Sequence, residues 1–338
     1  MRTLGRTGVK VSPLCLGAMM FGSYGNPDHD DSIRVIHAAL DAGINFVDTA
    51  DVYSRGESEE IVGKALVGRR DEVVLATKVH LPMDEDHNHR GNSRRWIFIE
   101  VENSLRRLGT DYIDLYQIHR PDPYTAIEET LGALTDLQRA GKIRYFGSST
   151  FPAYQIVQAQ WAAERHHTGR FVTEQPPYSL LCRAIEAEVL PVCQEYGMGV
   201  LCWSPLAAGW LSGRYRKGTA KPEHHRSRFT PGRFDLTKPA NRAKFEAADA
   251  FGGLADEIGV SLVHLAVAFT LNHPAVTSAI IGPRTIDQLT SQLDAADVVL
   301  TDEIGDRIDE IVPPGQDLNE LDRAWQPSAL RNPRLRRR

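Results

Sequence analysis

Eight short apolar runs, separated by amphipathic segments, constrain the fold of this chain more than any other feature. Each run is rich in Val, Ile, Leu and Tyr and has the length of one buried strand, whereas the segments between have helical apolar spacing. The runs span residues 14–20, 44–50, 73–79, 112–118, 143–149, 170–175, 198–204 and 277–282. Strands that alternate with helices build a parallel sheet, so we expect an α/β fold, either a closed (β/α)8 TIM barrel or an open doubly wound sheet.

The N-terminus favours the barrel. Residues 2–5 and 9–12 flank Arg6-Thr7-Gly8, and this pattern predicts a β-hairpin ahead of the first buried strand. Such a hairpin would close the bottom of a barrel.

A long insertion also favours the barrel. The chain between the seventh and eighth runs, 205–274, contains a polar loop at 215–235 and two helical patterns at 241–259 and 261–272. An insertion of this length at the rim of a barrel is more often a lid or a cofactor clamp than a linker. We therefore predict one barrel domain over 1–320 and a basic C-terminal tail over 321–338.

Composition excludes several classes of function. The net charge is -5, so the chain has no basic field for nucleic acid. The N-terminus is too polar for a signal peptide, and no apolar run reaches the roughly 18 residues of a membrane helix. The cysteines and histidines lack metal-ligand spacing. We expect a cytoplasmic protein without a metal, as a monomer or a homo-oligomer.

Four polar residues follow the second, third and fourth runs and suggest chemistry at one rim. They are Asp48, Tyr53, Lys78 and His119. Because parallel barrel strands deliver their C-terminal residues to one mouth, we expect these side chains to meet. Each alone has an ordinary structural explanation, as a cap, a packing aromatic, a surface charge or a rim histidine, but their joint appearance favours a site.

Together the four residues could deliver a proton to a carbonyl that receives a hydride. Tyr53 would be the proton donor, and Lys78 would stabilise its phenolate. Asp48 would hold the ammonium group, and a neutral His119 would orient the carbonyl oxygen. An aldolase with a Schiff base on Lys78 is less favoured, because Asp48 would keep the amine charged.

The chain resembles the aldo-keto reductase superfamily over nearly its whole length. The resemblance is carried by GINFVDTADVYSRGESEEIVGKAL, LATKV, RLGTDYIDLYQIHRPD, GKIRYFGSST, TEQPPYSLL, WSPLAAGWLSG and IIGPRT. It is strongest toward bacterial reductases related to potassium-channel β subunits. It implies a barrel that binds NADPH in an extended pose without a GxGxxG loop, and it assigns the catalytic tetrad to the four residues above.

The same resemblance implies the cofactor contacts. The nicotinamide would meet Ser149, Thr150, Gln175 and Trp203, although Thr150 stands where many members have Asn. The pyrophosphate would lie on residues 206–214, and Arg284 and Thr285 would meet the 2'-phosphate at a helix N-terminus. The full predicted set is Gly17, Met19, Asp48, Ser149, Thr150, Gln175, Trp203, Ser204, Pro205, Leu206, Gly209, Ser212, Gly213, Arg214, Gly282, Arg284, Thr285, Gln288 and Gln292.

The expected activity is NADPH-dependent reduction of aldehydes or ketones to alcohols. The alternative is an NADPH-binding, redox-sensing regulatory subunit, which the resemblance to channel β subunits permits. Arg120, where some relatives have a large aromatic residue, leaves the substrate open. It could favour a carboxylated aldehyde, or it could form a salt bridge to Asp122 or Glu128.

Overall fold

The computed structural model describes residues 1–218, 230–327, 330, 332 and 334. Parts of the predicted clamp loop at 215–235 and of the predicted tail at 321–338 therefore lie outside the described residues. No single helix in the described part of the chain is long and apolar enough to cross a membrane. The helices α8 (Pro239–Glu257) and α9 (Leu262–Asn272) pass that test only when they are taken together across a 96° bend.

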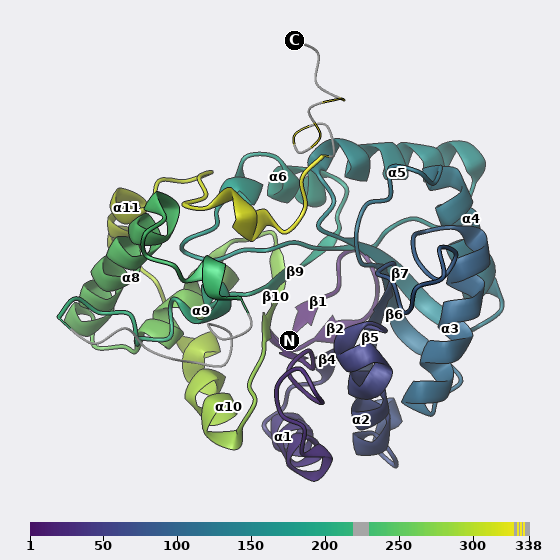
Figure 1. Cartoon of the computed structure of the whole chain (residues 1–338), viewed down its shortest axis with the longest axis horizontal. Helices are drawn as coiled ribbons and strands as arrows, with labels where there is room; N and C mark the ends of the chain where they lie inside the picture. Colours follow the sequence, from purple (N-terminus) through teal and green to yellow (C-terminus); the bar gives the residue numbers. More distant parts are fainter. Residues whose placement is uncertain (219–229, 328–329, 331, 333, 335–338) are drawn as a thin grey trace.

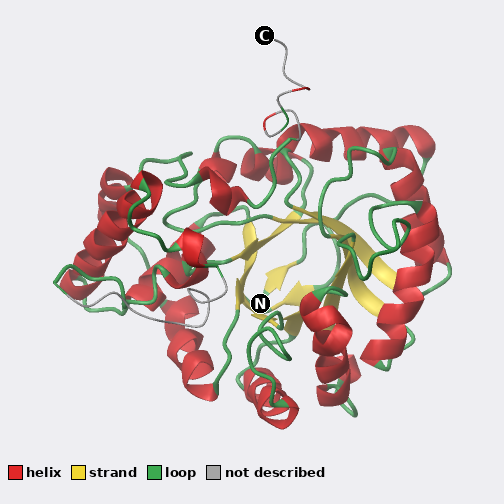
Figure 2. Ribbon diagram, in the orientation of Figure 1, coloured by secondary structure: helices red, strands yellow, loops and turns green. Residues whose placement is uncertain are grey.

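Eight parallel strands close into a barrel, with helices around it (Figures 1 and 2). The strands are β3 (Leu14–Gly17), β4 (Phe46–Asp48), β5 (Val74–Val79), β6 (Ile113–Ile118), β7 (Ile143–Ser149), β8 (Thr173–Gln175), β9 (Gly199–Trp203) and β10 (Val276–Ile281). Each lies in one predicted run except for one residue at the start of β10. Closure comes from β10, which pairs in parallel with both β9 and β3. The predicted TIM barrel is confirmed, and the open doubly wound sheet is excluded.

The hairpin that precedes the barrel is also present. β1 (Arg2–Thr3) and β2 (Lys10–Val11) pair antiparallel. Between them Gly5 has φ +55°, and a Cβ there would lie 2.7 Å from the backbone nitrogen of Gly199 at the start of β9. The hairpin therefore packs against the N-terminal ends of the barrel strands, as predicted, and only glycine permits this close approach.

The helices form the outer layer (Figure 2). They are α1 (His29–Asp41), α2 (Glu57–Ala65), α3 (Arg94–Leu108), α4 (Ile127–Arg139), α5 (Ala153–His166), α6 (Val189–Glu195), α8 (Pro239–Glu257), α9 (Leu262–Asn272), α10 (Ile286–Leu293) and α11 (Asp302–Ile311). Their ends follow local signals. In α3, for example, the Ser93 side chain accepts a hydrogen bond from the backbone of Trp96, and Gly109 ends the helix with φ +63°.

Alternation along the strands divides the core in two. One cluster fills the barrel interior with Leu4, Val11, Cys15, Phe46, Ala76, Leu115, Leu201 and Ile280. The neighbouring strand residues, such as Val47, Leu75 and Tyr116, face the helices and belong to the second, larger cluster. Because side chains in a strand alternate between two faces, strands such as β4, β5 and β6 contribute to both clusters.

Packing of the chain extends past residue 320, the end of the predicted domain. The carboxylate of Asp322 accepts hydrogen bonds from Lys244 Nζ at 2.7 Å and from Arg233 Nη2 at 2.8 Å. Lys244 is buried on α8, so this contact ties the end of the barrel domain to the insertion between β9 and β10.

Candidate active site

A polar layer lies above the apolar interior of the barrel, and strand alternation places it there. Asp48, Lys78 and Gln117 each follow an interior residue of the same strand by two positions, namely Phe46, Ala76 and Leu115. Residues two apart in a strand share a face. The three side chains therefore point into the barrel, one layer nearer its C-terminal mouth.

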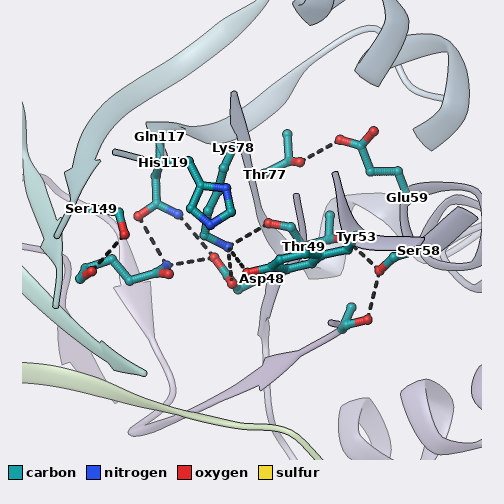
Figure 3. A network of polar contacts seen from close by, with 12 residues as sticks. Asp48, Thr49, Tyr53, Ser58, Glu59, Thr77, Lys78, Gln117, His119 and Ser149 are labelled. Atoms are coloured by element: carbon teal, nitrogen blue, oxygen red, sulfur yellow. Dashed lines mark hydrogen bonds and ion pairs between the residues drawn. The ribbon is translucent and has the colours of Figure 1, made fainter. Parts of the chain in front are cut away.

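Lys78 is the centre of this layer (Figure 3). Its Nζ donates to Asp48 Oδ2 at 2.5 Å, to the carbonyl of Thr49 at 2.8 Å and to the phenol oxygen of Tyr53 at 3.3 Å. Burial is the largest single influence and lowers the pKa of Lys78, but the charges and hydrogen bonds of Asp48 and Tyr53 together outweigh it, and the net shift is upward. The ammonium group is therefore charged at neutral pH beside the phenol.

A strained turn aims Tyr53 at Lys78. The next two residues, Ser54 and Arg55, have left-handed φ values of 48° and 56°, and Gly56 has φ 96°. Such backbone costs free energy and persists only where surrounding contacts hold it. Here the Ser54 hydroxyl donates to the carbonyl of Phe21 at 3.1 Å and accepts from the backbone of Tyr24 at 3.1 Å.

His119 completes the predicted group. Its ring packs edge-on against Tyr53, with 5.8 Å between ring centroids. Burial, followed by the positive charges of Arg120 and Lys78, holds the pKa of His119 well below its ordinary value. His119 is therefore neutral at pH 7 and has one N–H to donate, as the sequence predicts. The four predicted catalytic residues meet at one place.

Gln117 belongs to the same network and was missed from the sequence. Its Nε2 donates to Asp48 Oδ1 at 3.1 Å, and its Oε1 accepts from Gln175 Nε2 at 3.3 Å. Gln175 Nε2 also donates to Asp48 Oδ1 at 2.8 Å. The signal was available, because Gln117 lies two residues before His119 on the same face of the strand.

Two hydroxyl residues at the end of β7 lie beside this network. The Ser149 hydroxyl donates to the carbonyl of Gln175 at 2.9 Å and lies 3.3 Å from Thr150 Oγ1. Thr150 has φ 61° and accepts from Arg120 Nη1 at 3.0 Å. The side-chain nitrogen of Gln175, Nε2, is bonded within the barrel. The side-chain oxygen, Oε1, is therefore the atom left to accept a hydrogen bond from a nicotinamide carboxamide.

The segment after β9 turns sharply over the mouth. Trp203, which is partly buried, packs on the interior cluster, and Ser204, Ala207, Ala208 and Gly209 all have positive φ. The remaining predicted cofactor residues here are Pro205, which is buried, Leu206 and Ser212, which are partly exposed, and Gly213 and Arg214, which are exposed.

The backbone of this segment is less available to a phosphate than the sequence suggests. The N–H groups of Gly209 and Ser212 donate to the carbonyls of Leu206 and Gly209, at 2.8 Å and 3.2 Å. Among the described residues, no backbone acceptor faces the N–H groups of Gly213 and Arg214. A pyrophosphate on this segment would meet those two groups.

A second cationic feature lies at the end of β10. Burial, and then the positive charge of Arg214, lower the pKa of Arg284. Two guanidinium groups thus lie within electrostatic reach of each other beside the N-terminus of α10, which is favourable for a phosphate. The Thr285 hydroxyl accepts from the backbone of Gln288 as the helix cap.

Gln288 and Gln292, which belong to the predicted cofactor set, are partly committed to hydrogen bonds within α10 itself. Gln288 Oε1 accepts from the backbone of Arg284 at 2.9 Å, and Gln292 Nε2 donates to the carbonyl of Gln288 at 2.6 Å. Gln292 is buried. These contacts leave Gln288 Nε2 as the more accessible amide.

The remaining predicted contacts lie at the first and last strands. A Cβ on Gly17 would lie 2.7 Å from Ile280 Cγ2, so packing of β3 against β10 already requires that glycine. Met19 follows β3 and is partly exposed, and Gly282 follows β10 with open space around it.

A surface groove lies away from the tetrad, on another face of the barrel. It has a volume of about 680 Å³ and is lined by residues that include Arg70, Tyr112 and Lys142, which precede β5, β6 and β7. It therefore lies at the N-terminal face of the barrel, where side chains stabilise the fold. In the described part of the chain, no group of three His, Cys, Asp or Glu side chains could hold a metal ion.

Known proteins are similar to this chain in sequence. The family model described as Aldo/keto reductase family matches residues 13–313. An uncharacterized oxidoreductase of Bacillus subtilis, YrpG, is 41% identical over 95% of this chain and 98% of its own length.

Two further relatives differ in their named roles. A probable voltage-gated potassium channel subunit beta of Oryza sativa is 37% identical over 92% of this chain and 96% of its own. The aldo-keto reductase YhdN of Bacillus subtilis is 39% identical over 84% of each chain. The barrel, the assembled tetrad and these matches lead to one conclusion: the chain is a member of the aldo/keto reductase family.

Proposed function

We propose that this protein reduces aldehydes or ketones to alcohols with NADPH, with Tyr53 as the general acid. The observation that carries the proposal is the hydrogen-bonded chain from the buried Asp48 through the buried Lys78 to Tyr53, beside a neutral His119. A structural ion pair would not need a phenol at 3.3 Å from its ammonium group.

The tetrad divides the work of protonating a carbonyl oxygen. A reduced nicotinamide, when bound, supplies a hydride to the carbonyl carbon. Tyr53 donates its phenolic proton to the oxygen, and the charge of Lys78 stabilises the phenolate that remains. Asp48 holds that charge in place, and His119 donates a hydrogen bond to the same carbonyl oxygen.

The preference for NADPH over NADH rests on Arg284 and Arg214. Arg284 directly precedes Thr285, the N-cap of α10, and the positive charge of Arg214 lowers the pKa of Arg284. A 2'-phosphate carries about two negative charges at neutral pH and would relieve the repulsion between the two guanidinium groups. The neutral 2'-hydroxyl of NADH would not.

A regulatory subunit that binds NADPH is the second candidate. Relatives of this chain include proteins named as potassium channel β subunits in a plant and a yeast. The complete tetrad favours the enzyme, because sensing alone does not require a proton donor.

The test is oxidation of NADPH and NADH with an activated aromatic aldehyde, with Tyr53→Phe beside the unchanged protein. We expect clear preference for NADPH and, in the variant, a loss of at least about 100-fold in kcat, with NADPH affinity retained in a fluorescence titration. Tight NADPH binding without turnover by the unchanged protein would instead support the regulatory subunit. Equal use of NADH would contradict the phosphate role of Arg284.

A further inference from the structure

Arg120 lies at the mouth of the barrel, directly after His119. Its Nη1 donates to the carbonyl of His119 at 2.6 Å and to Thr150 Oγ1 at 3.0 Å. The guanidinium group is thereby held between the ends of β6 and β7, and the residue is only partly exposed.

The guanidinium group has no carboxylate partner among the described residues. Asp122, the nearest acid in the sequence, accepts instead from Thr125 Oγ1 and from the backbone of Asn92 and Tyr124. Glu128 is exposed and forms no ion pair with Arg120. Neither salt bridge that the sequence allowed for Arg120 is present.

The surroundings leave this positive charge largely uncompensated. Burial lowers the pKa of Arg120, and the opposing influences come from Tyr53 and Glu174, neither of which bonds to it. Glu174 is itself buried, and its oxygens accept from the Ser148 hydroxyl and the backbone of Phe151. A desolvated cation without an anion is costly, and a bound anion would offset that cost.

The free edge of the guanidinium group indicates which anion fits. Both bonds that the guanidinium group makes with described residues use Nη1, so Nε and Nη2 remain, and they form an edge with parallel N–H donors. That edge matches the two oxygens of a carboxylate. The guanidinium group is bonded to the carbonyl of His119, and its charge lowers the pKa of the His119 ring, so it lies near the predicted carbonyl site.

We propose that Arg120 binds a carboxylate of the substrate, so that the preferred substrates are oxo acids or carboxylated aromatic aldehydes. This inference rests on the proposed reductase function, since it assigns a substrate class to the same site. The carboxylate would accept from Nε and Nη2 of Arg120 while the carbonyl oxygen faces Tyr53 and His119.

The experiment compares 4-carboxybenzaldehyde with its neutral methyl ester at saturating NADPH. We expect a higher kcat/KM for the acid in the unchanged protein, although the ester group activates the aldehyde more. In Arg120→Met the acid-to-ester ratio should fall about 10- to 100-fold, the worth of hydrogen bonds between charged groups. In Arg120→Lys the acid-to-ester ratio should fall less than in Arg120→Met, because lysine keeps the positive charge but lacks the two parallel N–H donors.

Two controls separate this inference from the proposed function. Arg144→Met removes a guanidinium that stacks on Tyr112 toward the other end of the barrel, and it should leave the ratio unchanged. NADPH titration of each variant reports whether the cofactor site is intact. An unchanged ratio in Arg120→Met, with both aldehydes still reduced, would overturn the carboxylate site and leave the reductase standing.

A binding measurement covers the case in which neither aldehyde is reduced. Calorimetric titration of benzoate into the NADPH complex should then show binding that Arg120→Met weakens at least about 10-fold. That result would retain the carboxylate site without the reductase. Equal benzoate affinity in the variant and the unchanged protein would reject the carboxylate site at Arg120.

Discussion

At the scale of single residues, Gln117 is a positioning residue, because its amide side chain does not itself react but holds residues of the site. It donates to Asp48 and accepts from Gln175, so it fixes the orientation of both. Gln117→Leu should lower kcat about 10-fold, which corresponds to about 1.4 kcal/mol in the barrier. It should also move the alkaline limb of the kcat/KM profile to lower pH, because a looser Asp48 supports the charge of Lys78 less well.

Gln160→Leu is the matched control for this prediction. Gln160 is also buried, but on α5, where its amide donates to the carbonyl of Phe171. This variant should lose stability while the pH profile of kcat/KM stays in place. If the two variants give the same profile, Gln117 is a packing residue only.

At the scale of elements, Arg107 joins α2 to α3 beneath the turn that carries Tyr53. Its Nε donates to Glu59 Oε2 at 2.6 Å, and its Nη2 donates to Glu100 Oε1 at 2.5 Å. Both carboxylates are buried. Arg107→Met should therefore lower the free energy of unfolding by about 3–5 kcal/mol at pH 7, because it leaves two buried charges unpaired.

The neighbouring residue provides the control for Arg107. Arg106 is exposed, and among the described residues its side chain donates only to Asn103, so Arg106→Met should change stability by less than about 0.5 kcal/mol. Urea denaturation measures both. The loss in Arg107→Met should shrink at pH 4–5, where the orphaned carboxyls take up protons; a loss independent of pH would argue for packing by the side-chain stem instead.

At the scale of the whole molecule, Glu174 makes stability depend on pH. Burial between the barrel and its helices raises the pKa of Glu174 from 4.5 to about 7. Between these values the unfolded chain is ionised while the folded protein keeps the proton, so stability falls as pH rises. Above about pH 7 both states are ionised and this contribution is constant.

Glu174→Gln should remove this decrease in stability with rising pH. The difference in unfolding free energy between the variant and the unchanged protein should grow by up to about 1.4 kcal/mol per pH unit between pH 4.5 and 7, and then level off. Urea denaturation at pH 5, 6, 7 and 8 measures it. The other buried carboxyls, Asp51 and Glu59, are common to both proteins and cancel in the difference. Parallel stability curves would mean that Glu174 is ionised throughout.

Much of this protein is determined by its sequence alone. The eight runs and the hairpin are local patterns, because the alternation of apolar side chains depends only on residues near one another in the chain. The tetrad was predictable for the same reason: Asp48, Lys78 and His119 stand at strand ends, and a parallel barrel brings all such ends to one mouth.

Tertiary structure decided which partners each side chain has. Gln175 donates to Asp48 across 127 positions of sequence, and Gln117 stands opposite Lys78 only because β5 and β6 pair in that register. Arg120 has no carboxylate partner because Asp122 is held by Thr125 and two backbone N–H groups. These outcomes depend on which strands become neighbours when β10 closes onto β3, and no local pattern encodes a distance between segments that only closure brings together.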